Sequence, residues 1–467
     1  MSAGGAGLKE IARTLFAQAL AECSIERAFD RKLRVIADAE GARLVVEGGE
    51  AIALDRLRRV RVVAVGKAAA AMLNALLARL RLPGTSALQG VLIAAERPAN
   101  LPATIQYFCG GHPVPNEASF AGAQAALAML HALGQRSARN AMSRDDSAQN
   151  FAPDETLCIF LLSGGASAMM EFPLDAAISL DETVAFHRAL VHSGASIVEM
   201  NCVRKHFSAV KGGRLALAAG RAQTLSLLVS DVPPAHLDAL GSGPTIGDPT
   251  SIAECREILA KYGLMEKFPA SVRRFFASPD LPETPKPNEQ NARICKLVDS
   301  DEMAEAARLH AERLGFHAVI DNRCDDWSYD AAANYLLDRL RQLRREHSRV
   351  CLISAGEVTV RVNAASANAR GGRNQHFALY LVTQLRPDDG PLAILSAGSD
   401  GIDGNSDAAG AIVDEHTIDC SATCESALRA LAEFDSSTWL NAAGATVVTG
   451  PTGHNLRDLR ILLADSE

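Results

Sequence analysis

The sequence predicts an α/β protein of two domains, and three observations lead to this fold class. Strand-like and helix-like segments alternate through most of the chain, which favours parallel strands covered by helices. The 467 residues exceed the size of one ordinary domain. A stretch with clustered prolines, Pro279–Asn291, marks a boundary after which a fresh alternation begins. We therefore expect one domain over residues 1–285 and a second over residues 286–467.

Short apolar runs predict the strands, and longer runs at helical spacing predict the helices. In the first domain the expected strands are Arg61–Val65, Gly90–Ala95, Thr104–Cys109, Leu157–Leu162 and Thr224–Val229. The expected helices there are an amphipathic one from Leu8, then Ala68–Leu80 and Ala118–Leu133. The polar stretch Arg136–Asn150 has no periodicity and predicts an exposed loop. In the second domain the expected strands are Ile294–Val298, Val350–Ser354, Val358–Val362 and Leu392–Ser396.

Charge and composition exclude several classes of protein. The formal net charge is −8 and no basic stripe is present, which argues against a nucleic-acid surface. No apolar run reaches the length of a membrane span, and the amphipathic N-terminus does not look like a signal peptide. Ten scattered cysteines favour reduced thiols in a cytoplasmic protein. His416, Cys420 and Cys424 are spaced by four, but no fourth zinc ligand accompanies them. The sequence leaves open whether the chain forms a homodimer.

The familiar nucleotide-binding signatures are absent. Around Gly66-Lys67, Arg61 and Ala68 stand where a Walker phosphate loop needs a glycine and a hydroxyl residue. Gly241–Gly247 has the wrong spacing for a dinucleotide fingerprint and contains a proline. The signature set of protein kinases is also missing. An anion site in this chain must therefore be built differently.

Seven glycine-rich segments carry charged or hydroxyl residues at predicted strand ends or loops. Glycine lets backbone N–H groups approach an anion closely, and a following helix adds a favourable dipole. Each segment alone is an ordinary turn, but so many in one chain indicate a binding site. The segments are Val65–Lys67, Gly110–Pro115, Ser163–Ser167, Ser230–Thr245, Gly371–Gln375, Ser399–Gly404 and Thr449–Asn455.

Several charged side chains within these segments have two interpretations. Lys67 follows a buried-type strand, which favours a site residue over a solvated lysine. Arg373 either binds a ligand or caps a loop. Asp400 and Asp403 are turn formers or ligands of Mg²⁺, an ion that proteins hold through one or two carboxylates together with phosphates. Glu357, at a strand start, is open in the same way.

As an ordered set, these segments resemble the glycerate 2-kinase family whose C-terminal part is the MOFRL domain. Members of that family have often been labelled hydroxypyruvate reductases. The resemblance runs from about Leu8 to the C-terminus. Two departures from the family pattern are Ala166, in the place of a third glycine after Ser163, and His454, in the place of a small hydroxyl residue. Further motifs that carry the resemblance are Asn201–Lys205, Lys211–Gly213, Gly356-Glu357 and Ala408–Gly410.

The resemblance implies a fold, a reaction and a set of site residues. The fold would be an N-terminal Rossmann-like three-layer α/β/α sandwich and a smaller mixed α/β C-terminal domain, with the active site in the cleft between them. The reaction would use ATP and Mg²⁺ to convert D-glycerate to 2-phosphoglycerate. Lys67 and Arg373 would be the key active-site cations, and Asp400 and Asp403 the metal ligands. The expected substrate- or nucleotide-binding residues are Gly66, Ser163, Gly164, Gly165, Ser167, Lys211, Asp231, Ser242, Gly243, Glu357, Gly372, Asn374, Gln375 and Thr452.

Phosphoryl transfer needs positioning and charge neutralisation more than covalent chemistry by the protein. We expect Lys67 and Arg373 to face the transferring phosphate or the glycerate carboxylate, and a carboxylate near the metal to accept the hydroxyl proton. Asp231 is a further metal candidate. One rival is an NAD(P)-dependent hydroxypyruvate reductase, which would need a dinucleotide fingerprint. The other is a non-catalytic anion binder, which the paired aspartates disfavour because they would repel an anion.

Overall fold

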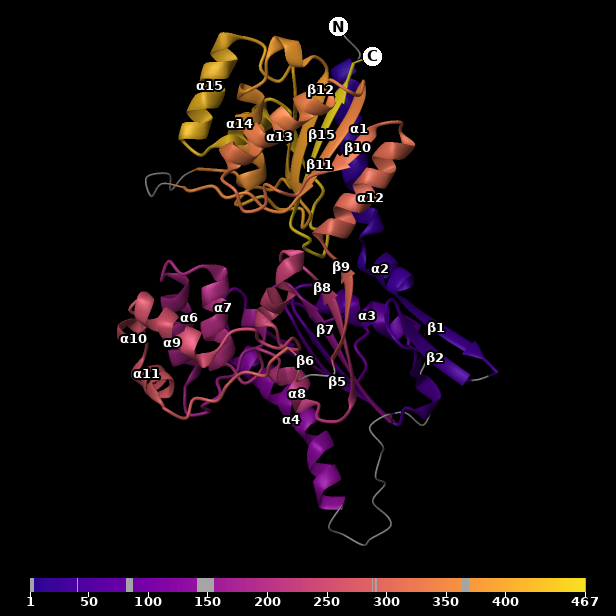
Figure 1. The fold of residues 1–467 in the computed structure, drawn as a ribbon, viewed down its shortest axis with the longest axis vertical. Helices are drawn as coiled ribbons and strands as arrows, with labels where there is room; N and C mark the ends of the chain where they lie inside the picture. The colour runs from indigo at the N-terminus through magenta and orange to yellow at the C-terminus, as the bar shows by residue number, and fades with distance from the viewer. Residues whose placement is uncertain are drawn as a thin grey trace. The chain divides into compact units, whose positions relative to one another are not determined.

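The structure is a computed structural model that describes residues 4–39, 41–80, 87–140, 155–287, 289, 292–362 and 369–466. The chain forms two compact units, both drawn in Figure 1. The N-terminal unit is Ala28–Leu297. The C-terminal unit is Val298–Glu467 together with Met1–Arg27. Each unit has its own six-stranded sheet, and the α/β fold class predicted from the sequence is confirmed.

The sheet of the N-terminal unit has the strand order β6-β5-β4-β7-β8-β9. The pairs β6–β5, β5–β4, β4–β7 and β7–β8 are parallel. The middle strands are apolar and buried along nearly their whole length, as expected for a sheet covered on both faces. The strands are β4 (Arg59–Val65), β5 (Ala87–Ala94), β6 (Ile105–Cys109), β7 (Thr156–Ser163), β8 (Gln223–Val229) and β9 (Ala292–Val298).

The strand order reverses between β4 and β7. From β4 the chain adds β5 and β6 on one side, then returns to add β7 and β8 on the other. In open parallel sheets this switch point is where ligands bind, outside the carboxyl ends of the strands. The helices that follow the strands here are α3 (Ala69–Arg79), α4 (Glu117–Asn140), α5 (Ala166–Met169) and α8 (Arg214–Ala218), with the 3-10 helix η3 (Pro234–Ser242).

A group of helices in the N-terminal unit has a core of its own beside the sheet (Figure 1). Stacked rings of Phe186 and Phe207 lie at its centre. Three of its helices begin at a capping box, in which a serine and a glutamate satisfy the first backbone N–H groups. The helices are α6 (Leu180–Val191), α7 (Ile197–Phe207), α9 (Ile252–Lys261), α10 (Leu264–Lys267) and α11 (Ala270–Ala277). The unit also holds the larger part of α2 (Ile25–Lys32), η1 (Leu54–Arg56) and a small antiparallel sheet of β1 (Leu33–Asp38), β2 (Gly41–Val46) and β3 (Ile52–Ala53).

The sheet of the C-terminal unit is mixed, with the order β10-β11-β15-β12-β13-β14. Only β10–β11 is a parallel pair, and the last strand of the chain, β15, is inserted between β11 and β12. Helix α1 (Gly4–Glu22) packs against α12, β12 and β15 of this unit. The strands are β10 (His317–Ile320), β11 (Arg349–Ala355), β12 (Leu392–Gly398), β13 (Gly410–Asp414), β14 (Thr446–Val447) and β15 (Asp458–Asp465). The other helices are α12 (Ser300–Arg313), α13 (Tyr329–Leu343), α14 (Arg373–Thr383), η4 (Pro387–Asp389), α15 (Ser421–Ala432) and α16 (Ser436–Ala442).

The structure differs from the sequence-based expectations in four respects. The strand expected at Ile294–Val298 is β9, which lies at the edge of the first sheet and not in the second domain. The expected division at 285/286 therefore falls before the last strand of the N-terminal unit, and α1 belongs with the other unit. Val358–Val362 is no strand and makes one isolated bridge, between Thr359 and Ser328. Helix α4 continues to Asn140, so the first part of the loop expected at Arg136–Asn150 is helical, and residues 141–154 lie outside the described residues.

Candidate active site

Two glycine loops meet at the switch point of the N-terminal sheet. Gly66 follows β4 with a φ of +121°, and a side chain there would collide with Ser163 at the end of β7. The Lys67 backbone N–H donates to the Gly164 carbonyl at 2.9 Å, and the Ala68 N–H donates to Ser163 Oγ at 3.0 Å. These bonds link the carboxyl ends of β4 and β7 and hold the exposed side chain of Lys67 next to them.

Glycine is also required at the two positions after Ser163, because other groups approach them closely. A side chain at Gly164 would overlap the carboxylate of Asp231, which follows β8. Gly165 has a φ of +84°, and its missing Cβ would lie 3.2 Å from both Lys67 Cγ and His112 Cδ2. Partial burial and the charge of Lys67 lower the pKa of His112. A lysine, an imidazole and a carboxylate thus lie together around this loop, at the carboxyl ends of the central strands.

A cavity of about 560 Å³ opens next to this loop within the N-terminal unit. It is bounded by the loop after β7, by α6 and α7, and by η3. Of the predicted site residues, Gly165, Ser167, Asp231 and Ser242 line it. Its other polar side chains include His112, His187, Asn201 and Arg204.

The side chains of Lys211 and Ser242, two of the predicted binding residues, make contacts within the protein. Lys211 is fully buried, and its ammonium group pairs with the buried carboxylate of Glu171. Ser242 Oγ lies 2.9 Å from Ser167 Oγ and donates to Asn201 Oδ1 at 2.9 Å. Both side chains therefore hold the walls of the cavity in place. The neighbouring Gly243 ends η3 with a φ of +64°.

In the C-terminal unit, Arg373 lies at the first turn of α14, after Gly371 and Gly372. Its guanidinium contacts Asp458 at 2.6 Å (Nε to Oδ2) and Glu357 at 2.6 Å (Nη2 to Oε1). Burial and the charge of Asp458 raise the pKa of Glu357. The cation that the sequence predicted is thus held between two carboxylates, one of which, Asp458, the sequence analysis did not single out.

Asp403 caps the beginning of α14. Its carboxylate accepts the backbone N–H groups of Asn374 at 3.0 Å and Gln375 at 2.8 Å, and a side chain at Gly372 would collide with it. Burial raises the pKa of Asp403 to about 6. Asp400 has a turn-forming role as well, because its Oδ1 accepts the Ile402 N–H at 3.1 Å.

A second cavity, of about 760 Å³, brings these groups together within the C-terminal unit. Thr452 lies next to the aspartate loop, where its N–H donates to the Asp400 carbonyl and its hydroxyl to the Ser399 carbonyl. Gln375, by contrast, is fully buried in α14. The predicted residues that line this cavity are Glu357, Gly372, Arg373, Asn374, Asp400 and Asp403.

The donors of the second cavity suit Mg²⁺, which prefers carboxylate oxygens. A cation beside Asp403 would offset the burial that raises the pKa of this carboxyl group. Among the described residues, the one group of three close soft ligands is elsewhere, at the buried side chains of Cys202, His206 and Cys255.

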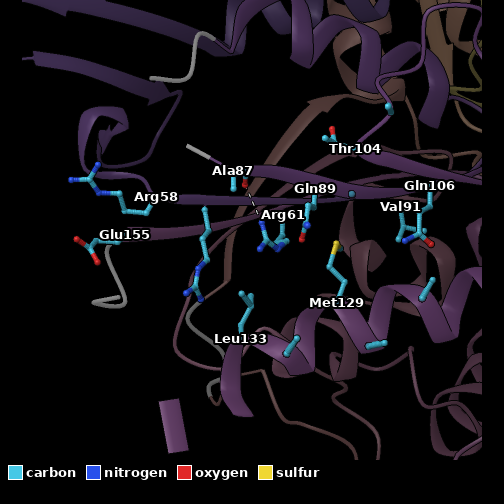
Figure 2. Close-up of a pocket in the computed structure, with 16 residues that line it drawn as sticks. Arg58, Arg61, Ala87, Gln89, Val91, Thr104, Gln106, Met129, Leu133 and Glu155 are labelled. Atoms are coloured by element: carbon cyan, nitrogen blue, oxygen red, sulfur yellow. Dashed lines mark hydrogen bonds between the residues drawn. The ribbon is translucent and has the colours of Figure 1, made fainter. Parts of the chain in front are cut away.

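A larger cavity of about 1410 Å³ lies at the opposite, amino ends of the strands in the N-terminal unit. Figure 2 shows Arg58 and Arg61 near the start of β4, with Met129 and Leu133 of α4 below Arg61. Arg61 donates to the carbonyls of Val60 at 3.1 Å and Ala87 at 3.0 Å. Since ligands of parallel sheets bind at the carboxyl ends, we do not assign the active site here.

Several polar residues in or beside the two candidate cavities had not been singled out from the sequence, among them Arg204, His187 and Asp458. Arg204 stood inside a motif that was used only for the resemblance. His187 lies in a helix with no glycine signal nearby, and Asp458 is the first residue of the buried strand β15, which also contains Arg460. A carboxylate at the first position of a mainly apolar strand is the signal that could have identified Asp458.

Known protein families match both the N-terminal and the C-terminal part of the chain. A family model described as a domain of unknown function (DUF4147) matches residues 11–277, and the MOFRL family model matches residues 350–458. D-glycerate 2-kinase from Thermotoga maritima is 34% identical over 411 residues, which cover 87% of this chain and 90% of the relative. Glycerate 2-kinase from Pyrococcus horikoshii is 30% identical over 98% of each chain.

A solved structure and a further relative are also similar to this chain over most of its length. The crystal structure of glycerate kinase from T. maritima matches with a TM-score of 0.77 and 30% identity, covering 98% of this chain and 99% of that one. A relative from Agrobacterium vitis, named only provisionally as a hydroxypyruvate reductase, is 36% identical over 87% of each chain. In the part of the chain that the structure describes, no helix is both long and apolar enough to cross a membrane.

Proposed function

The chain belongs to the glycerate 2-kinase family with a C-terminal MOFRL domain, and from this premise we propose that it transfers the γ-phosphate of ATP to the 2-hydroxyl of D-glycerate. The products are 2-phosphoglycerate and ADP. The observation that carries this proposal is the match to named glycerate 2-kinases over 87% to 98% of the chain. The family membership predicted from the ordered glycine motifs is confirmed.

We propose that the N-terminal unit supplies a phosphate-binding edge. The Gly66 and Gly164 loops bring backbone close together at a strand switch point, where N–H groups can approach phosphate oxygens. Lys67 adds an ammonium group there that pairs with no described carboxylate. Facing the charge that develops on the transferring phosphoryl, it would stabilise the transition state more than the ground state.

We propose that the C-terminal unit contributes Arg373 and the carboxylates around it to the same reaction. Asp458 fixes the guanidinium through two hydrogen bonds, so that its remaining N–H groups are aimed before a substrate binds. Glu357 is a candidate for the group that accepts the 2-hydroxyl proton, because its raised pKa brings it closer to the working pH. Asp231, at the edge of the N-terminal cavity, is the alternative acceptor.

We propose Asp400 and Asp403 as the residues that hold Mg²⁺. When bound, this ion neutralises phosphate charge. Asp403 already accepts backbone N–H groups, so Asp400 has more freedom to bind the ion. Asp400→Asn should therefore raise the Mg²⁺ concentration for half-maximal activity several-fold, whereas Asp407→Asn, an exposed change in the same loop, should not. An unchanged metal dependence of the Asp400 variant would move the ion to other ligands.

One experiment tests the proposed reaction against its rival. Purified protein with ATP, Mg²⁺ and D-glycerate should form ADP, and ³¹P spectroscopy should place the new phosphate on the 2-oxygen. A parallel reaction with NADH or NADPH and hydroxypyruvate tests the NAD(P)-dependent reductase. Rapid oxidation of the reduced nucleotide, with no ADP formed from glycerate, would overturn the kinase assignment.

Two properties of the whole protein complete the proposal. We propose a cytoplasmic location, where ATP is available and the ten free cysteines stay reduced. A homodimer is a further proposal, and light scattering coupled to gel filtration gives the mass that decides it.

A further inference from the structure

Arg204 is a cation of the N-terminal cavity that has no carboxylate partner. It lies on α7, is half-buried and lines the cavity beside the glycine loop. Its Nη1 donates only a long hydrogen bond, 3.4 Å, to Asn201 Oδ1. Its Nε is buried and makes no hydrogen bond. Within the described ranges, no acidic side chain forms an ion pair with it.

The acidic group that acts on Arg204 from a distance is already neutralised. Glu171 is fully buried and pairs with Lys211, and it also accepts hydrogen bonds from His187 at 2.9 Å and from Ser208 at 2.5 Å. Burial lowers the pKa of His187, so this ring adds no charge near neutral pH. Burial lowers the pKa of Arg204, and the charge of Glu171 raises it only in part. Because Glu171 forms its ion pair with Lys211, the guanidinium of Arg204 has no ion-pair partner among the described residues of this desolvated wall.

A half-buried arginine without a counter-ion is costly, because removing a charge from water is repaid only by a partner. The cavity around Arg204 offers further donors for such a partner. Asn201 uses its Oδ1 for Arg204 and Ser242, which leaves its amide NH₂ as a donor. Two donors side by side, one of them a planar guanidinium, match the two oxygens of a carboxylate.

We infer that Arg204 binds the carboxylate of the hydroxy-acid substrate in the cavity between the glycine loop and α7. The inference rests on the proposed function, which requires a small substrate with a carboxylate at one end and a reacting hydroxyl next to it. With the carboxylate at Arg204, the hydroxyl would point towards the rim where Lys67 and Gly165 lie. A nucleotide phosphate is the other anion that could occupy Arg204.

Kinetics of Arg204→Gln distinguish these two anions. The variant should raise KM for D-glycerate by about 10- to 100-fold, the scale of a lost charge-assisted hydrogen bond, and leave KM for ATP within about twofold. Arg188→Gln is the matched control, because Arg188 lines the same cavity on α6 but is exposed. A rise in KM for ATP alone, or equal effects in both variants, would overturn the inference.

A second measurement separates binding from folding and from the reaction itself. Titration calorimetry of D-glycerate without ATP should show binding to the wild type and its loss in Arg204→Gln, with circular dichroism confirming that the variant is folded. If the Gln variant fails to fold, Arg204→Lys should fold and show a smaller loss of affinity. Wild-type binding that needs Arg204, without any kinase activity, would refute the reaction but keep the site. Glycerate binding that is absent from the wild type or unchanged in the variants refutes the site.

Discussion

The two candidate cavities differ in whether their cations are paired with carboxylates of the protein. In the C-terminal unit Arg373 contacts both Asp458 and Glu357. In the N-terminal unit Lys67 and Arg204 form no ion pair with a described residue, although Lys211, a few residues further along the chain, pairs with Glu171 inside the protein. A compensated cation mainly fixes geometry, whereas an uncompensated one is available to an anionic ligand. We therefore propose that the N-terminal cavity binds an anion and that Arg373 positions the carboxylates of the C-terminal one.

The largest effect on stability should come from breaking the buried ion pair between Lys211 and Glu171 in the N-terminal unit. Lys211→Met leaves the carboxylate of Glu171 buried and should lower the free energy of unfolding by about 3–5 kcal/mol. Chemical denaturation measures this loss. The double variant Glu171→Leu/Lys211→Met removes both charges and should recover part of the stability. If Lys211→Met melts like the wild type but loses affinity for substrate, the comparison is wrong and the lysine is a ligand-binding residue.

An uncompensated cation should affect turnover without affecting the fold. Lys67→Ala should lower kcat by about 10²- to 10³-fold, the scale for losing one preorganised group that stabilises charge in the transition state. Its exposed side chain should contribute about 1 kcal/mol or less to stability. Lys67→Arg should restore activity only in part, because a planar fork does not replace a compact ammonium. Lys267→Ala, an exposed lysine of the same unit, is the control. Near-normal kcat of the Lys67→Ala variant would return this residue to a structural role.

Replacing Arg373 should lower both the stability of the protein and its turnover. Arg373→Gln leaves Asp458 and Glu357 facing each other, and we expect a loss of about 1–3 kcal/mol in stability, since the arginine is itself 36% exposed. Turnover should fall as well, because the aimed guanidinium is gone. Melting temperature and kcat measured on one preparation test this. A variant with unchanged melting would show that the two carboxylates are not held apart by the arginine.

The smallest effect is a pH dependence of stability at Asp403. Its pKa is about 6 in the folded protein and lower in the unfolded chain, so its contribution is present at low pH and is lost as pH rises through about 6. Asp403→Asn removes this titration. The stability difference between wild type and variant should shift in favour of the variant by roughly 1 kcal/mol from pH 5 to pH 8. Denaturant titrations at both pH values measure it, and a difference independent of pH would place the pKa of Asp403 in its ordinary range.

The sequence alone determined the local features of this protein. Mostly apolar runs of five and six residues became β4, β7 and β8 because a strand buried on both faces needs no other signal. The glycines of the first loop could be recognised because positive φ values and close backbone contacts, as at Gly66, exclude other residues. Lys67 and Arg373 could be singled out because they are adjacent to such loops.

Only the tertiary structure decided which distant residues meet. Asp458 lies 85 residues after Arg373, and Glu171 lies 40 residues before Lys211, and no local pattern encodes either pairing. The same holds for β15, which is the last strand of the chain and yet pairs with β11 and β12, and for α1, which packs with the opposite end of the sequence. The charge state of a site depends on these long-range partners, because burial and neighbouring charges set the cost of each ion. The sequence could therefore identify Lys67 and Arg373 but not Arg204, and the folded protein determines which cations are left for a ligand.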